Sequence, residues 1–254
     1  MFAPAHLRVP RRDQAILGGL LVGLAVAASL ALLLWQASPY GGYLHHEGAG
    51  GTPLPLEASL FTIGWLLMIV AMMLPSSIPL TVTFAALVGR RRHPGRLVAL
   101  LLVGYLLVWV GFGLAAWLAD RGIHAAVDAL PWLAAHPQVI MGTTLLAAGL
   151  WQFSSVRDHC LEECRSPLGF VLNRWRGTSE RREALAMGIA HGAFCVGCCW
   201  SLMLVLFGVG LGNVPAMLGL GGLIAVEKNL PWGRRLTHPL GVALIIGAVY
   251  VVAT

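Results

Sequence analysis

Long apolar runs separated by short polar segments make up most of the chain. Seven of these runs approach the roughly 20 residues that a helix needs to cross a lipid bilayer. They lie at about 15–35, 58–88, 97–119, 138–155, 183–207, 211–227 and 237–253. The second run is too long for one straight span and contains Pro75 and Pro79, which predicts a kinked helix with an interfacial end. The sixth run is the shortest.

The composition supports the same picture. Of 254 residues, 57% are hydrophobic and only 11% are charged, and the mean hydropathy is +0.77. Such a chain has no room for a soluble domain, so we predict an all-α polytopic bundle of about seven spans in contact with the lipid bilayer. This bundle forms a single integral membrane domain, residues 1–254. The first run has a basic flank but no clear cleavage site, which favours an uncleaved span over a signal peptide.

The basic residues predict an orientation. All 17 Lys and Arg residues except Arg121 lie before the first run or between runs two and three, four and five, or six and seven. Because Lys and Arg collect in cytoplasmic loops, the N-terminus is expected in the cytoplasm and the C-terminus outside. The same rule accounts for the net charge of +6, so no nucleic-acid partner is expected.

Ligand-type side chains interrupt the fifth run in the stretch HGAFCVGCCWSLM, residues 191–203. At about 100° per residue, four of them share an arc of roughly 100° on one helix face. They are His191, Cys195, Cys198 and Cys199. A single Cys in a span is usually a packing residue, but ionisable groups within a membrane favour a functional interpretation. The pattern predicts metal or thiol chemistry, and Met187 and Met203 extend this face with further sulfur atoms.

A second cluster, HCLEEC at 159–164, follows the fourth run. Cys160 and Cys164 have helical i, i+4 spacing, which places both sulfurs on one side if a helix continues that far. Arg157 and Arg165 nearby would favour thiolate over thiol, and Pro167 should end the helix. An odd total of five cysteines, two of them in a cytoplasmic loop, favours free thiols or thiolate ligands over disulfides.

Four segments together resemble a bacterial family described as predicted metal-binding integral membrane proteins, some members of which are implicated as copper chaperones for tyrosinase-type polyphenol oxidases. The segments are WLLMIVAMMLPSS (65–77), CLEECRSP (160–167), HGAFCVGCCWSLM (191–203) and EKNLPWG (227–233). The resemblance covers about residues 58–235 and implies a bacterial cytoplasmic (inner) membrane location. It implies a set of candidate metal ligands: Cys160, Cys164, Cys195, Cys198 and Cys199, with His191, Met72, Met73 and Glu227 as further members of the pattern.

Two positions depart from the family pattern. Arg157 stands where a lysine is expected, which keeps the charge. Gly212 stands where a methionine is usual, which removes one thioether near the outer end of the sixth span. Sulfur ligands favour Cu(I) over hard cations, whereas Zn(II) accepts Cys and His equally well. The ligand set therefore ranks Cu(I) first and Zn(II) second.

Two polar segments allow more than one interpretation. Glu227 and Lys228 could be a helix end at which both side chains meet water. Alternatively, Glu227 could orient His191 or accept protons from thiols that bind metal. The Gly-rich outer segment 43–48 contains His45, His46 and Glu47, which could collect or release a metal, although adjacent histidines in a loop are ordinary. His124, Asp128 and His136 lie in the next outer loop.

The function predicted is that of a copper chaperone or transfer protein, not an enzyme. Cys160 and Cys164 would capture Cu(I) at the cytoplasmic face and pass it to His191 and the three cysteines of the fifth span, with Met72 or Met73 opposite. The partners implied are a client copper enzyme or a soluble metal donor, and a second copy of the chain in a homo-oligomer. The main alternative is a membrane thiol oxidoreductase that uses Cys195 and Cys198. A second alternative is a structural membrane subunit with inert cysteines.

Overall fold

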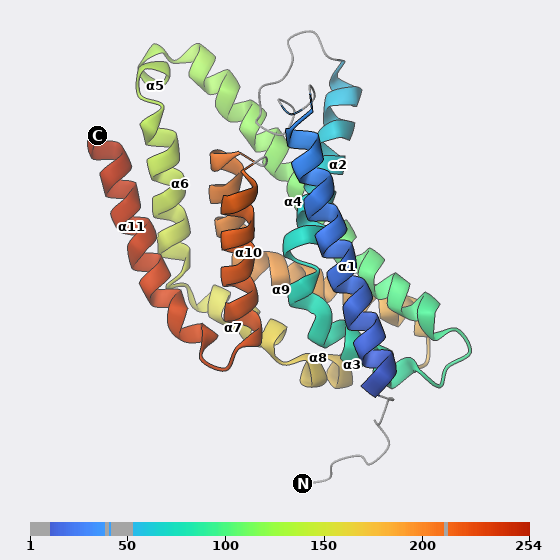
Figure 1. Cartoon of the computed structure of the whole chain (residues 1–254). Coiled ribbons are helices and arrows are strands. Elements are labelled where there is room, and N and C mark those ends of the chain that lie inside the picture. Colours follow the sequence, from blue (N-terminus) through green and yellow to red (C-terminus); the bar gives the residue numbers. More distant parts are fainter. Residues whose placement is uncertain (1–10, 39–40, 42–52, 211–212) are drawn as a thin grey trace.

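The computed structural model describes residues 11–38, 41, 53–210 and 213–254, and these residues form helices joined by short connections, with no strand among them (Figure 1). The predicted all-α fold is confirmed. The longer helices are α1 Arg11–Gln36, α2 Leu54–Met72, α3 Ile78–Val88, α4 Pro94–Ala129, α6 Gln138–Trp151, α7 Ser155–Arg165, α9 Glu180–Val209, α10 Val214–Asn229 and α11 Thr237–Ala253. Two shorter helices are α5 Pro131–Ala135 and α8 Pro167–Arg174.

Five helices in the described ranges are long and apolar enough to cross a membrane, and the pair α6 and α7, bent by 66°, makes up to six. The sequence predicts seven. The difference lies in run 211–227, which forms α10, a helix of 16 residues. Asn213 caps the start of α10 by accepting a hydrogen bond from the Ala216 amide at 3.1 Å, and the helix stops before Pro231 because proline disfavours helical backbone in the residue before it.

The second apolar run is broken where its prolines predict a kink. α2 ends at Met72, a 3₁₀ turn spans Pro75–Ser77, and α3 follows at Ile78. Proline cannot donate to the preceding turn, so carbonyl oxygens at the break accept side-chain hydroxyls instead. Ser76 donates to the Met73 carbonyl and Ser77 to the Leu74 carbonyl, both at 2.8 Å. The Met73 carbonyl is thereby directed toward the interior.

α4 and α9 pack backbone against backbone through glycines. A Cβ atom on Gly188 would overlap the carbonyl oxygen of Leu101, and one on Gly104 would overlap that of Leu185. A Cβ on Gly192 would lie 3.0 Å from the Tyr105 carbonyl oxygen. Small residues four apart allow this approach, and Gly188 and Gly192 provide them on α9. The same approach brings Tyr105 of α4 beside the cysteine-bearing part of α9.

The outer surface of the bundle is apolar. Large hydrophobic side chains on α1 and α11 are exposed, among them Leu34 at 74%, Ile246 at 63% and Tyr250 at 67%. Contiguous exposed apolar surface on this scale marks contact with lipid or another protein. In contrast, the helix faces that meet in the centre carry the sulfur-rich cluster described below.

We predict that Gly188→Ala lowers stability by about 1–3 kcal/mol, because the added methyl group would have to displace the α4 backbone. Gly222→Ala on α10 is the matched control, since a Cβ there meets no atom within 4 Å and alanine favours a helix over glycine. Thermal unfolding of the two purified variants in detergent measures the difference. Equal melting temperatures would contradict the close α4–α9 contact.

Candidate metal site

The cysteines of α7 and α9 meet in the centre of the bundle. Ser154 caps α7 by accepting a hydrogen bond from the Val156 amide at 3.2 Å, and the bend after α6 turns α7 onto α9. A Cβ placed on Gly197 would lie 2.6 Å from the Cys160 sulfur, so this thiol packs directly on the α9 backbone. The Cys164 thiol interacts with that of Cys198. The cysteines of segment 159–164 and those of segment 191–203 therefore form one group. This group lies at the level of Gly197 along α9 and not at the start of that helix.

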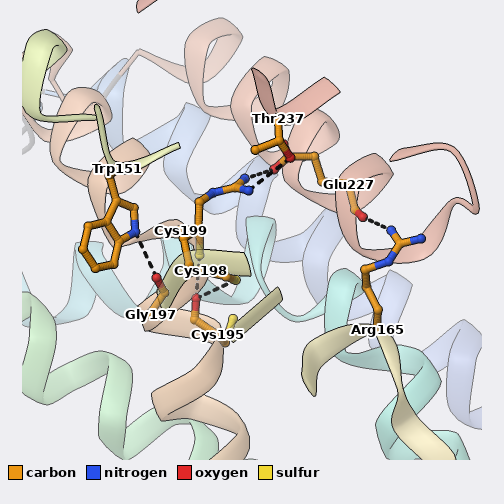
Figure 2. A network of polar contacts seen from close by, with 9 residues as sticks. Trp151, Arg165, Cys195, Gly197, Cys198, Cys199, Glu227 and Thr237 are labelled. Carbon is orange, nitrogen blue, oxygen red and sulfur yellow. Dashed lines mark hydrogen bonds and ion pairs between the residues drawn. The ribbon is translucent and has the colours of Figure 1, made fainter. Parts of the chain in front are cut away.

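Within α9 the three cysteines are almost fully buried. Cys195 is 0% exposed, and Cys198 and Cys199 are each 2% exposed. The thiols of Cys198 and Cys199 donate to the Cys195 carbonyl oxygen at 3.1 and 2.8 Å (Figure 2). All five cysteines are free, as the sequence predicts. Each of these two thiols would have to leave its backbone bond and rotate in order to bind an ion.

A buried ammonium group lies against the thiols. Lys228, 5% exposed, places its Nζ 2.8 Å from the Cys195 sulfur, and it interacts electrostatically with Cys198, Cys199 and Cys164. Burying a cation is costly unless an anion pairs with it. The interpretation that Lys228 meets water at a helix end is wrong. Its nearest potential anion is the Cys195 sulfur.

The neighbouring carboxylate, Glu227, binds other side chains and not the thiols. Glu227, 2% exposed, forms an ion pair with Arg157 of α7 at 2.8 Å and accepts a hydrogen bond from Thr237 at 3.1 Å. Arg157 also donates to the Thr237 hydroxyl at 3.1 Å. Both carboxylate oxygens therefore have partners, and neither partner is His191. Glu227 does not meet water either, so the first interpretation of this pair is wrong for both residues.

Arg165 ties α7 to the segment after α10. It donates to the Glu227 carbonyl oxygen (Figure 2), and to the carbonyls of Leu230 at 2.9 Å and Pro231 at 3.2 Å. Its guanidinium thus bonds to the backbone. Together with the Arg157–Glu227 pair, this contact holds α7 against the C-terminal end of α10, which is the end predicted to face the cytoplasm. It thereby keeps Lys228 beside the thiols.

His191 occupies an aromatic niche one turn before Cys195. Its ring stacks on Tyr105, with centroids 5.4 Å apart, and meets Phe170 edge-on at 5.6 Å. The ring is 4% exposed, and its Nδ1 atom has no hydrogen-bond partner among the described residues. Buried polar atoms without partners are rare. This nitrogen is therefore available as a ligand atom.

Tyr105 connects three parts of the site. Its hydroxyl lies 3.1 Å from the Cys195 sulfur and 3.3 Å from the Met73 carbonyl oxygen, to which it donates. Met73 is 0% exposed and Met72 is 3% exposed, and both belong to the buried cluster that contains the cysteines. Met72 packs on α10, where a Cβ on Gly221 would lie 3.2 Å from its Cγ. The structure thus places both methionines in the same buried core as the thiols.

No group of three or more His, Cys, Asp or Glu side chains in the described ranges is arranged to hold a metal ion. The thiols lie together, but their hydrogen bonds turn them toward the helix backbone. Cu(I) accepts few ligands and prefers sulfur, so rotation of two neighbouring thiols would suffice to bind it. A four-ligand zinc site would need a larger rearrangement.

The other sequence candidates stand apart from this site. His45, His46 and Glu47 lie outside the described residues. The Nδ1 atoms of His124 and His136 lie within hydrogen-bond distance of carbonyl oxygens of their own helices. Three residues near the thiols were missing from the predicted ligand set: Lys228, Tyr105 and Arg157. Their signal in the sequence is weak. Lys228 resembles a residue at a helix end, Tyr105 a core aromatic and Arg157 a loop arginine, and only their burial in the structure shows otherwise.

Comparison with known proteins gives one match. The model of the PpoB2 family, described as a copper chaperone, matches residues 62–251. No curated protein and no solved structure matches the chain. The matched segment covers about three quarters of the sequence and includes every candidate ligand from Met72 to Glu227. The chain therefore belongs to the PpoB2 family of copper chaperones.

Proposed function

We propose that the protein is a membrane-embedded chaperone that binds Cu(I) between thiols of α7 and α9 and delivers it to a client copper enzyme. The observation that carries this proposal is the contact of Cys164 with Cys198 beside the buried Lys228. Two thiols from different helices and a fixed positive charge meet in a dry interior. Inert packing cysteines would not require a buried ammonium group.

Charge balance supports Cu(I) over Zn(II). Two thiolates and one Cu(I) ion carry a single net negative charge, and Lys228 supplies the compensating positive charge. A site that is neutral when loaded avoids the large cost of leaving a net charge in a low-dielectric interior. Glu227 adds no charge to the site, because Arg157 neutralises it at 2.8 Å. Sulfur ligands and low coordination also suit Cu(I).

Access to the site supports entry through α7. Cys164 is half-buried, whereas the other four cysteines are buried. A donor protein exchanges Cu(I) by forming a shared sulfur complex, which requires one thiol within its reach. We therefore assign Cys164 as the receiving thiol and Cys198 as the second thiolate of the loaded site, with Cys160 and Cys199 as neutral thiols that can replace either ligand during transfer. Cys195 remains a neutral thiol beside Lys228, and His191 adds a nitrogen one turn away.

The proposed topology has seven crossings with the N-terminus in the cytoplasm. In Figure 1, α1 begins at the lower edge of the bundle and α11 ends near the top, as an odd number of crossings requires. α6 and α10 extend from the top toward the bottom, although α10 is short for a span. The Lys and Arg residues other than Arg121 lie in segments that this topology puts in the cytoplasm.

The thiol oxidoreductase is the second candidate, and burial disfavours it. Thiol–disulfide exchange requires a partner sulfur to reach the attacking thiolate. Cys195 and Cys198 are 0% and 2% exposed, and each sulfur is already engaged within the protein. Metal transfer can begin at the half-buried Cys164, whereas neither thiol of the Cys195–Cys198 pair is accessible to a partner disulfide.

Replacing both Cys164 and Cys198 with Ser should lower the affinity for Cu(I) at least 100-fold, because oxygen is a poor ligand for this ion. Competition with a chromophoric Cu(I) chelator, using reduced protein in detergent, gives the dissociation constant. Ser201→Ala, which removes a buried hydroxyl from the same part of α9, is the control and should leave the affinity for Cu(I) unchanged. A double variant with wild-type affinity would refute the chaperone site.

Lys228→Leu should weaken Cu(I) binding by about 10- to 100-fold, the range typical of residues that support metal ligands. Leucine removes the charge and adds no ligand atom, so the loaded site would carry an unbalanced negative charge. The same chelator competition measures the effect. Arg234→Leu, at an exposed position near α7, removes a positive charge without touching the thiols and should have little effect; equal losses in both variants would argue against a specific role for Lys228.

The orientation can be tested with reporter fusions. Alkaline phosphatase fused after Thr254 should be active, because it folds only outside the cytoplasm, whereas a fusion at residue 92 should be inactive. Green fluorescent protein at the same two positions should give the opposite result. Activity of the phosphatase at residue 92 would invert the proposed topology.

A further inference from the structure

Three fully buried methionines adjoin the thiol group and take no part in it. They are Met68 of α2, Met203 of α9 and Met217 of α10, each 0% exposed. All three belong to the same buried cluster as Cys195, Cys198 and Cys199. They come from three different helices, so their relative positions depend on tertiary packing and not on spacing along one helix.

The contact of Lys228 with Cys195 fixes the level of α10 against α9. The two helices run in opposite directions, joined through a turn at Gly210, which has a φ of 100°. Met203 lies eight residues after Cys195, about 12 Å further along α9. Met217 lies eleven residues before Lys228, about 16 Å along α10. The Lys228 side chain leans back toward the start of its helix and spans part of that distance, so Met203 and Met217 reach similar heights.

Met68 reaches the same level by a separate contact. Met72 packs on Gly221 of α10, 3.2 Å from the position of a Cβ there. α2 and α10 both run from the top toward the bottom in Figure 1. Met68 lies one turn before Met72, and Met217 lies one turn before Gly221. Moving up one turn on both helices therefore brings these two residues beside each other, above the thiols.

We propose that Met68, Met203 and Met217 form a second site for a soft monovalent cation, stacked beyond the thiols toward the end of the bundle where α10 begins. The proposal extends the copper-binding function proposed above by adding a place to which the ion can move. Thioethers bind Cu(I) and Ag(I) and select against hard cations. They are neutral and bind more weakly than thiolates, so an ion placed there is easier to release.

The arrangement gives the ion a direction. Cys199 lies one turn before Met203 on the same face of α9, so an ion held by Cys199 can gain a thioether ligand before it loses the thiolate. The path begins at Cys164, on the side predicted to face the cytoplasm, and ends at a thioether site nearer the opposite side of the membrane. Delivery to a client outside the cytoplasm follows from this order of ligands.

The test uses full-length reduced protein in detergent with ¹³C-labelled methionine methyl groups, titrated with Ag(I). Resonances are assigned with single Met→Leu variants, which conserve volume and are usually tolerated. We expect the Met68, Met203 and Met217 methyl signals to shift together once the thiols are filled. Met187 is the matched control, because it is also buried on α9, at 1% exposure, but packs in a different cluster; its signal should not move.

A thiol-free comparison separates the two proposals. In the variant with Ser at all five cysteines, which are Cys160, Cys164, Cys195, Cys198 and Cys199, Ag(I) should still shift the three methionine signals. In the Met68→Leu, Met203→Leu, Met217→Leu triple variant, the thiolate–metal absorption band should remain while the protein binds one Ag(I) ion fewer. Unmoved methionine signals with an intact thiolate band would overturn the thioether site and leave the chaperone standing. The reverse result would overturn the thiol site alone.

Discussion

The arrangement of the whole site depends on one buried positive charge. Lys228 lies in the interior with its Nζ 2.8 Å from the Cys195 sulfur, and a buried ammonium group needs an anion within reach. The adjacent carboxylate cannot serve, because Arg157 and Thr237 occupy both oxygens of Glu227. The sequence neighbours Glu227 and Lys228 thus belong to two separate charge pairs, one that joins α10 to α7 and one that joins α10 to α9.

A broken helix supplies the second constraint. Pro75 interrupts the hydrogen bonds that would continue α2, and the Met73 carbonyl at the break accepts the Tyr105 hydroxyl. That hydroxyl also contacts Cys195, while the Tyr105 ring stacks on His191. A local defect in one helix is thereby connected through one aromatic side chain to two candidate ligands on another. The Pro-containing segment contributes to the site without placing a ligand atom of its own at the thiols.

Much of this architecture can be predicted from the sequence, because hydrophobic runs, proline positions and the Cys-rich helix face depend on local chemistry. From the sequence, Cys160 and Cys164 are predicted only to pass an ion to the α9 cysteines. Their direct packing on α9 depends on the 66° bend after α6, which is a tertiary feature. The burial of Lys228 and Arg157 was missed because each resembles a residue at a water-facing helix end. The seventh span stays a prediction, because the Asn213 cap and the stop before Pro231 limit α10 to 16 residues, and hydropathy alone does not register these two signals.

The glycine contacts between α4 and α9 limit how an ion can be handed on. Where two backbones touch, neither helix can slide or rotate without a steric clash, so Tyr105 and the three α9 cysteines form a stationary platform. The moving parts must be the elements that side chains hold in place, namely α10, tied to this platform through Lys228, and α7, tied to α10 through Arg157 and Arg165. Binding and release of the ion then require only that a few polar contacts break. The helix pair that bears the central thiols keeps its shape throughout the cycle.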